Sequence, residues 1–212
     1  MRAPRPASLL RYSPALFLFV VVVADAGRWA DPDLWGHVYF GRLILGLRHL
    51  PPRDIFSYSA YGHPWFDHEW LSEVVLASAY DAFGVLGLKL LKFVCTALMI
   101  TLLALGTAET GASMRLQLAV LVTEAVAIGP MVQFRPQLFD FIGLSALLLL
   151  LARDSYRRRG RLWPAIPLLA LWANFHGGFF VGIVVLAVYA AAAAAEDALA
   201  GWERGARCAP AA

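Results

Sequence analysis

The feature that most constrains this chain is a series of long apolar runs separated by short polar segments. Of its 212 residues, 60% are hydrophobic and only 16% are charged. A water-soluble domain keeps about a quarter of its residues charged, because its surface faces water. Long apolar runs are typical of helices in lipid, where a helix satisfies its own backbone hydrogen bonds. The sequence therefore predicts an all-α, polytopic transmembrane helical bundle.

About six helices are expected to cross the membrane. The last apolar region is too long for one straight span, at about 1.5 Å per residue across about 30 Å of hydrocarbon. It is divided at Asn174-Phe175-His176-Gly177-Gly178, where polar side chains and two glycines permit a tight reversal. The predicted spans cover residues 9–25, 86–106, 116–132, 138–152, 162–174 and 178–195. They form one transmembrane module, residues 1–195, followed by a tail at residues 196–212.

The first span has a second interpretation. Three arginines precede a short apolar core, which ends at the small residues Ala24-Asp25-Ala26. This pattern also fits a cleavable signal peptide. An uncleaved anchor is the simpler prediction, because further spans follow. In both cases the residues after Ala26 lie outside.

The orientation follows from a basic loop at residues 153–161, which contains five arginines. Short loops rich in arginine stay in the cytoplasm. The N-terminus and the 196–212 tail are therefore expected inside. A long outer loop, residues 26–85, lies outside, and two helical stretches within it, 34–47 and 69–83, are expected to lie along the membrane surface.

Three polar clusters are expected to meet on the outer face. The first is Asp31-Pro32-Asp33 with His37, the second is residues 133–137 with Asp140, and the third is residues 174–176. Two carboxylates one residue apart can share a divalent cation, or one can act as a base that the other orients. Arg135 could hold a phosphate through its planar fork of donors.

Each cluster also has a structural interpretation. Asp-Pro-Asp after a span is commonly a helix cap, Arg135 can be an interfacial anchor, and His176 can be a turn residue. A metal cluster at His63, Asp67, His68 and Glu69 is a further alternative, but Pro64-Trp65 interrupts its helical spacing. The candidate site residues are Asp31 and Asp33 for catalysis or metal binding, and His37, Arg135, Gln137, Asn174 and His176 for substrate binding.

The order of these features resembles the GT-C superfold of membrane glycosyltransferases, which take sugars from polyprenyl-phosphate carriers. The stretches that carry the resemblance are DPDLWGHVYFGRLILGLRHLPPRDIFSYSAYGHPWFDHEWLSE, QFRPQLFD and WANFHGGFF. Asp31 falls where the family has the catalytic or metal-binding aspartate of its first outer loop. Two departures are that Arg135 stands where oligosaccharyltransferases carry a second acidic pair, and that family members usually have ten or more spans.

The resemblance implies transfer of a sugar from a polyprenyl-phosphate donor to an envelope glycan, lipid or protein acceptor, on the outer face of a bacterial inner membrane. Asp31 would be the general base or would hold a divalent cation, Mg²⁺ or Mn²⁺. Asp33 would orient it, and Arg135 with His176 would steady the departing phosphate. We expect the chain to be an N-terminal part or a truncated member of such a family.

Two other functions fit the same sequence. One is a non-catalytic membrane subunit or carrier for lipid-linked or polar substrates, and the other is an inactive truncated fragment. Membrane lipids are expected partners in every case. Nucleic acid is not, because 18 basic residues are nearly balanced by 15 acidic ones.

Overall fold

The computed structural model describes residues 31–128, 131–157 and 162–207. Within these ranges the protein is all-helical, with six helices and no strands. The helices are α2 (Leu34–Leu47), α3 (Trp70–Glu109), α4 (Met114–Ile128), α5 (Gln137–Arg157), α6 (Ala165–Trp172) and α7 (Phe179–Arg207). The predicted first span, residues 9–25, lies outside the described residues.

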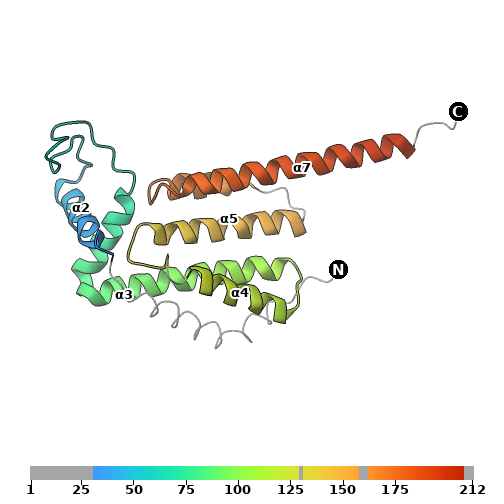
Figure 1. Cartoon of the computed structure of the whole chain (residues 1–212), viewed down its shortest axis with the longest axis horizontal. Helices are drawn as coiled ribbons and strands as arrows, with labels where there is room; N and C mark the ends of the chain where they lie inside the picture. The colour runs from blue at the N-terminus through green and yellow to red at the C-terminus, as the bar shows by residue number, and fades with distance from the viewer. Residues whose placement is uncertain (1–30, 129–130, 158–161, 208–212) are drawn as a thin grey trace.

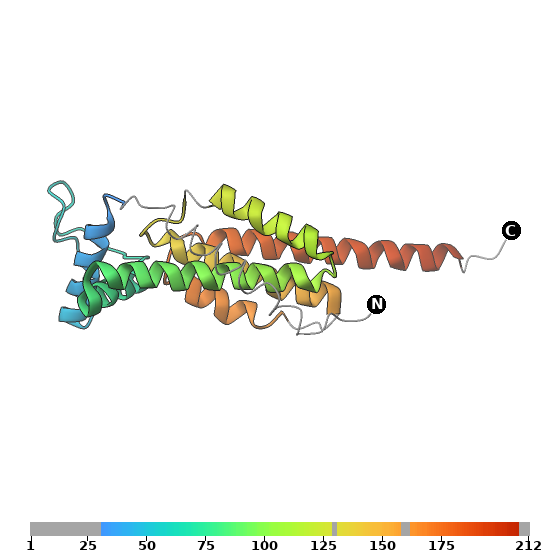
Figure 2. The same cartoon turned by 90° about the horizontal axis from the view of Figure 1, so that it is seen from below.

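The helices form a long bundle with a head at one end (Figures 1 and 2). The bundle consists of α4, α5, α6, α7 and the second arm of α3, which run alongside one another. The head consists of α2, the first arm of α3 and the loop between them, residues 48–69. The structure thus consists of a head and a longer helical bundle.

The two arms of α3 meet at Gly84, which has φ 58° and ψ −141°. A side chain would clash in this conformation, so glycine is the residue that allows the bend. The bend divides α3 into the two elements that the sequence predicts separately, a surface helix at 69–83 and a span at 86–106. The first arm packs against α2, and the second arm packs against α5.

Among the residues that the structure describes, two helices are long and apolar enough to cross a membrane, namely Trp70–Glu109 and the part of α7 from Phe179 to Ala200. These two helices indicate a membrane-associated protein. Only 6% of the α7 segment is buried inside the structure, so nearly all of its apolar surface is available to lipid.

The predicted bundle of six spans is not confirmed in the described residues. The expected span at 162–174 contains only α6, whose eight residues extend about 12 Å. Pro164 precedes this helix and the chain reverses after Trp172, so the helix is limited at both ends. In the predicted tail at 196–212, α7 continues as far as Arg207. The alanine-rich sequence before Glu196 favours this continuation, since alanine has the highest helix propensity.

Glycines allow the closest helix contacts. A Cβ atom at Gly41 of α2 would lie 2.0 Å from the backbone oxygen of Glu73 and 2.8 Å from the Cβ of Ala77. A Cβ atom at Gly143 of α5 would lie 2.4 Å from the ring of Trp172. These contacts hold the head on α3 and the turn after α6 on α5, so they bring the polar segments of the chain together.

Replacing Gly41 with alanine should therefore destabilise the head. We expect Gly41→Ala to lower stability by about 1–3 kcal/mol, because the methyl group has no room against the α3 backbone. Gly46→Ala in the same helix is the matched control, since nothing lies within 4 Å of its added Cβ. The measurement is thermal unfolding in detergent micelles. Equal melting temperatures for the two variants would contradict the α2–α3 contact.

Candidate functional site

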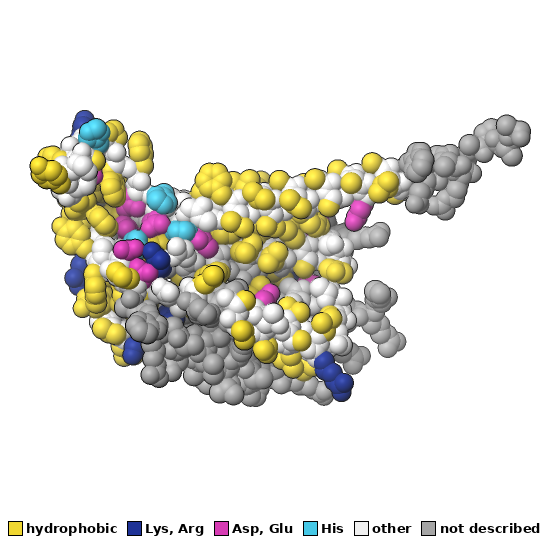
Figure 3. Space-filling view, viewed as in Figure 1, with side chains coloured by type: hydrophobic (Ala, Val, Ile, Leu, Met, Phe, Trp, Pro, Cys, Tyr) yellow, Lys and Arg dark blue, Asp and Glu magenta, His cyan; other side chains and the backbone are white. Residues whose placement is uncertain are grey.

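Polar side chains gather where the head meets the bundle, on a surface that is otherwise largely apolar (Figure 3). They come from four segments that are far apart in the sequence: residues 31–37, 67–73, 133–140 and 174–178. We call these four segments the junction site. The three clusters predicted to meet lie in this site, together with the start of α3.

Arg135 joins the first two predicted clusters. Its Nε lies 3.0 Å from Oδ2 of Asp31, and its Nη2 donates to Oδ2 of Asp33 at 2.9 Å. Asp31 is 7% exposed, whereas the side chain of Asp33 is 64% exposed. Asp33 precedes α2 but makes no side-chain cap hydrogen bond. The Asp-Pro-Asp motif therefore anchors a guanidinium.

His176 joins the third cluster to α3 and α5. Its Nδ1 lies 2.5 Å from Oδ2 of Asp140, and its Nε2 lies 3.1 Å from Oε1 of Glu69. The other oxygen of Asp140 accepts a hydrogen bond from Nε1 of Trp172 at 2.6 Å. Both ring nitrogens can donate only when the imidazole is protonated. The two carboxylates, Asp140 first, raise the pKa of His176 to about 9.

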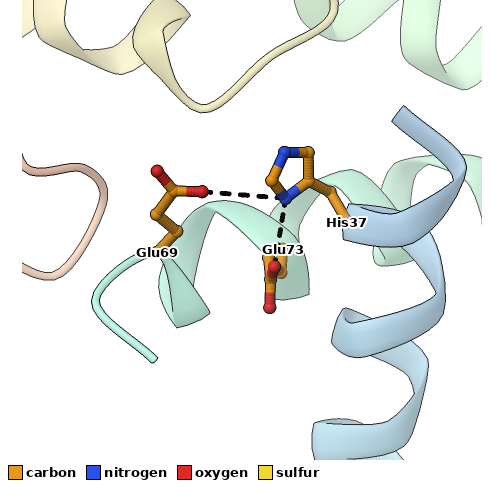
Figure 4. Close-up of side chains that lie close together, drawn as sticks. All are labelled: His37, Glu69 and Glu73. Carbon is orange, nitrogen blue, oxygen red and sulfur yellow. Dashed lines mark hydrogen bonds and ion pairs between the residues drawn. The ribbon is translucent and has the colours of Figure 1, made fainter. Parts of the chain in front are cut away.

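His37 lies between two carboxylates of the first arm of α3 (Figure 4). Its Nδ1 is 3.0 Å from Oε1 of Glu73 and 3.7 Å from Oε2 of Glu69. Glu73 is only 4% exposed, and its Oε2 has no hydrogen-bond partner among the described residues. Burial raises the pKa of Glu73 to about 7, with Asp67 adding to the rise and the hydrogen bond from His37 opposing it.

Glu69 connects the two histidines. Burial alone would raise its pKa, but the hydrogen bond and charge of His176 outweigh this effect and lower it. Burial alone would lower the pKa of His37. The hydrogen bond to Glu73 and the charges of the nearby carboxylates outweigh this effect, so the net shift is upward. The histidines therefore favour the cationic form and Glu69 favours the anionic form.

The remaining predicted residues have different places. Asn174 accepts a hydrogen bond from Nε1 of Trp70 through its side chain, and its backbone oxygen accepts one from the amide of Leu71. It ties the turn to α3.

Gln137 instead lines a pocket of about 270 Å³. The pocket is lined by Met131, Gln133, Arg135, Gln137 and Phe141. The structure thus brings all seven predicted residues to one end of the bundle, and their roles remain predictions.

Three central carboxylates were not among the predicted site residues, although Asp140 was placed in the second polar cluster and Glu69 in the alternative metal cluster. Glu69 and Glu73 are one helical turn apart, so they share a face, and this spacing was the available signal. Asp140 lies in the first turn of α5, where no spacing identifies its partner.

The alternative metal cluster is divided in the structure. His68 lies 3.5 Å from Glu69, whereas the backbone of exposed His63 pairs with that of Asp54 in the outer loop.

Comparisons of the chain with protein-family models, with curated proteins and with solved structures found no match. The function is therefore argued from the junction site. One part of this site offers a guanidinium beside a pocket, which suits an anion. The other part offers imidazole and carboxylate groups side by side, which suits proton transfer or metal binding.

Stability should fall with rising pH because of His176. The pKa of His176 is about 9 in the folded state and about 6.5 in the unfolded state. Protonated His176 therefore stabilises the fold fully below pH 6.5, and this stabilisation is lost as the pH rises through about 9. We expect a loss of about 2 kcal/mol, since the side chain is 19% exposed and partly screened. The measurement is thermal unfolding from pH 6 to pH 10 in metal-free detergent buffer.

His176→Gln is the control for this pH dependence. It should flatten the profile between pH 6.5 and pH 9, and Asp140→Asn should reduce its slope, because one of the two carboxylate partners is lost. A His176→Gln profile with the same slope as the wild type would show that another group causes the change.

Proposed function

We propose that this chain is a glycosyltransferase-like membrane protein that takes a sugar from a polyprenyl-phosphate donor and passes it to an acceptor on the outer face of a bacterial inner membrane. The observation that carries the proposal is the placement of Arg135. Its guanidinium is anchored by two carboxylates, lines a pocket, and lies at the end of an apolar bundle. A lipid-linked phosphate needs such a cation at the membrane surface.

Arg135 has donors that remain for a ligand. A guanidinium carries five N–H groups, and the contacts to Asp31 and Asp33 use Nε and Nη2. The other donors face no carboxylate among the described ion pairs. The side chain is 37% exposed, so a phosphate can reach it. The apolar lining residues Met131 and Phe141 would contact the first carbons of the lipid chain.

In the proposed transfer, an acceptor hydroxyl oxygen forms a bond to the anomeric carbon of the sugar. The bond between that carbon and the phosphate oxygen breaks, and its electron pair leaves with the polyprenyl phosphate. Arg135 stabilises the charge that develops on this leaving group. Asp33 takes the hydroxyl proton, because it is the exposed carboxylate and a phosphate on Arg135 would weaken its present ion pair. Buried Asp31 positions Arg135.

The proposed orientation has support at the other end of the bundle. There Nε of Arg153 lies 3.2 Å from Oε1 of Glu109, near the C-terminal ends of α5 and α3. Arg153 begins the arginine-rich loop that is expected in the cytoplasm. The junction site lies at the opposite ends of the same two helices, which corresponds to the outer face. The proposal includes the six crossings and the cytoplasmic N-terminus.

Arg135→Gln should weaken donor binding at least about tenfold, because charge-assisted hydrogen bonds contribute about 1.5–3 kcal/mol. Arg153→Gln is the matched control, since it removes the same kind of ion pair at the other end of the bundle and should leave binding unchanged. The assay uses proteoliposomes and radiolabelled polyprenyl-phosphate sugars, and measures bound donor and transferred sugar separately.

Asp33→Asn should keep donor binding and lose transfer. Equal donor binding by wild type and Arg135→Gln would overturn the proposal. Donor binding without transfer by the wild type, across acceptors from the bacterial envelope, would favour the carrier instead.

A further inference from the structure

We propose that His37, Glu69 and Glu73 form a binding site for one divalent metal ion of the zinc, manganese or cobalt class. This site is distinct from the Asp31 and Asp33 pair that the sequence suggests, because Arg135 contacts that pair. The metal assignment goes beyond the proposed transfer and does not depend on it.

Two of the three distances between the ligand atoms are close to the spacing that a metal ion requires. Around a zinc ion with bonds of 2.0–2.2 Å, tetrahedral ligand atoms lie roughly 3.3–3.6 Å apart. Nδ1 of His37 lies 3.0 Å from Oε1 of Glu73 and 3.7 Å from Oε2 of Glu69. All three groups have ligand atoms within 4.8 Å of one another. Figure 4 shows the imidazole from α2 directed toward both carboxylates.

The second oxygen of Glu73 is a further observation, because it is buried and the acidic group near Glu73, Asp67, is not a cation. Glu73 is 4% exposed, and its Oε2 accepts no hydrogen bond from the described residues. Burying a carboxylate is costly unless a cation or donors compensate it. A metal ion can bind one or both oxygens of a carboxylate. An ion bound through both oxygens of Glu73 would also contact Oε2, which Figure 4 shows on the side of the carboxylate away from His37.

The side chains around the cluster also offer fewer cationic groups than acidic groups. Glu69 and Glu73 carry two carboxylates, and the carboxylate of Asp67 lies near Glu73. Three histidines lie against these acids: His37, exposed His68 at 3.5 Å from Oε1 of Glu69, and His176, which is shared with a fourth acid, Asp140. A divalent cation would balance these carboxylates after displacing any proton on the imidazole.

The donor set selects the class of metal. Mg²⁺ and Ca²⁺ prefer ligand sets made of oxygen, whereas one imidazole with two carboxylates suits zinc, manganese or cobalt. The contacts around the ligands also fit a metal site. Oε1 of Glu69 is held by His176, which leaves Oε2 directed toward His37, and such outer contacts orient metal ligands.

Three protein ligands leave at least one position for water or a substrate oxygen. A hydroxyl bound there would lose its proton more readily. In the proposed transfer this position would hold the acceptor hydroxyl. It lies one helical turn from Asp33, the carboxylate that is proposed to take the hydroxyl proton. This role rests on the proposed function, whereas the metal site does not.

The test is metal binding by the full chain in detergent micelles. The protein is stripped with a chelator and titrated with Zn²⁺ by calorimetry, and Co²⁺ is added separately as an absorbing probe. We expect one ion per chain, and at least about tenfold weaker binding in His37→Ala and in Glu69→Gln, which keeps the side-chain shape. His63→Ala is the matched control, since this exposed histidine of the same outer loop lies outside the cluster.

A further variant separates the two acidic sites. Asp33→Asn should bind Zn²⁺ as the wild type does, and melting temperatures show whether each variant remains folded. Unchanged affinity in folded His37→Ala and Glu69→Gln would overturn the assignment, as would loss of the ion in Asp33→Asn alone. No activity is measured, so a failed metal site and a failed transferase proposal give different results.

Discussion

Charge pairing at the end of an apolar bundle is the constraint on which the junction site depends. Carboxylates withdrawn from water are stable only when cations or donors compensate them. Asp31 is paired with Arg135, and Glu69 lies between His37 and His176. The partners come from different helices and turns. Satisfying the charges therefore draws α2, α3, the start of α5 and the turn before α7 together, so the same contacts hold the head and build the site.

The first turn of α2 divides the junction site into two parts. Asp33 precedes the helix and faces Arg135, whereas His37 follows one turn later and faces the carboxylates of α3. The amide of His37 donates to the backbone oxygen of Asp33 at 3.1 Å, so the spacing of the two parts is rigid. An anion at Arg135 and a cation at His37 would lie on either side of this turn. Such an arrangement suits a reaction in which a phosphate leaves while a hydroxyl attacks.

The bend at Gly84 makes this arrangement possible. A straight α3 would carry Glu73 away from the bundle by about 16 Å, at about 1.5 Å per residue over eleven residues. The bend instead places the first arm beside α2 and over the end of the bundle (Figure 1). Close contact at Gly41 then brings the two helices near enough for His37 to reach Glu73.

The sequence by itself determined the all-helical class, the helical stretch at 34–47 and the set of polar clusters that meet, because apolar runs and short motifs are local properties. It did not predict that residues 162–174 contain only a short helix, because Pro164 and the reversal after Trp172 limit that helix. The continuation of α7 to Arg207 was not predicted either, although its alanine-rich sequence favours helix. Only the tertiary structure placed Arg135 against Asp31 and made Glu69 the central carboxylate. Pairing depends on how helices rotate and bend relative to one another, and no local pattern of residues specifies that geometry.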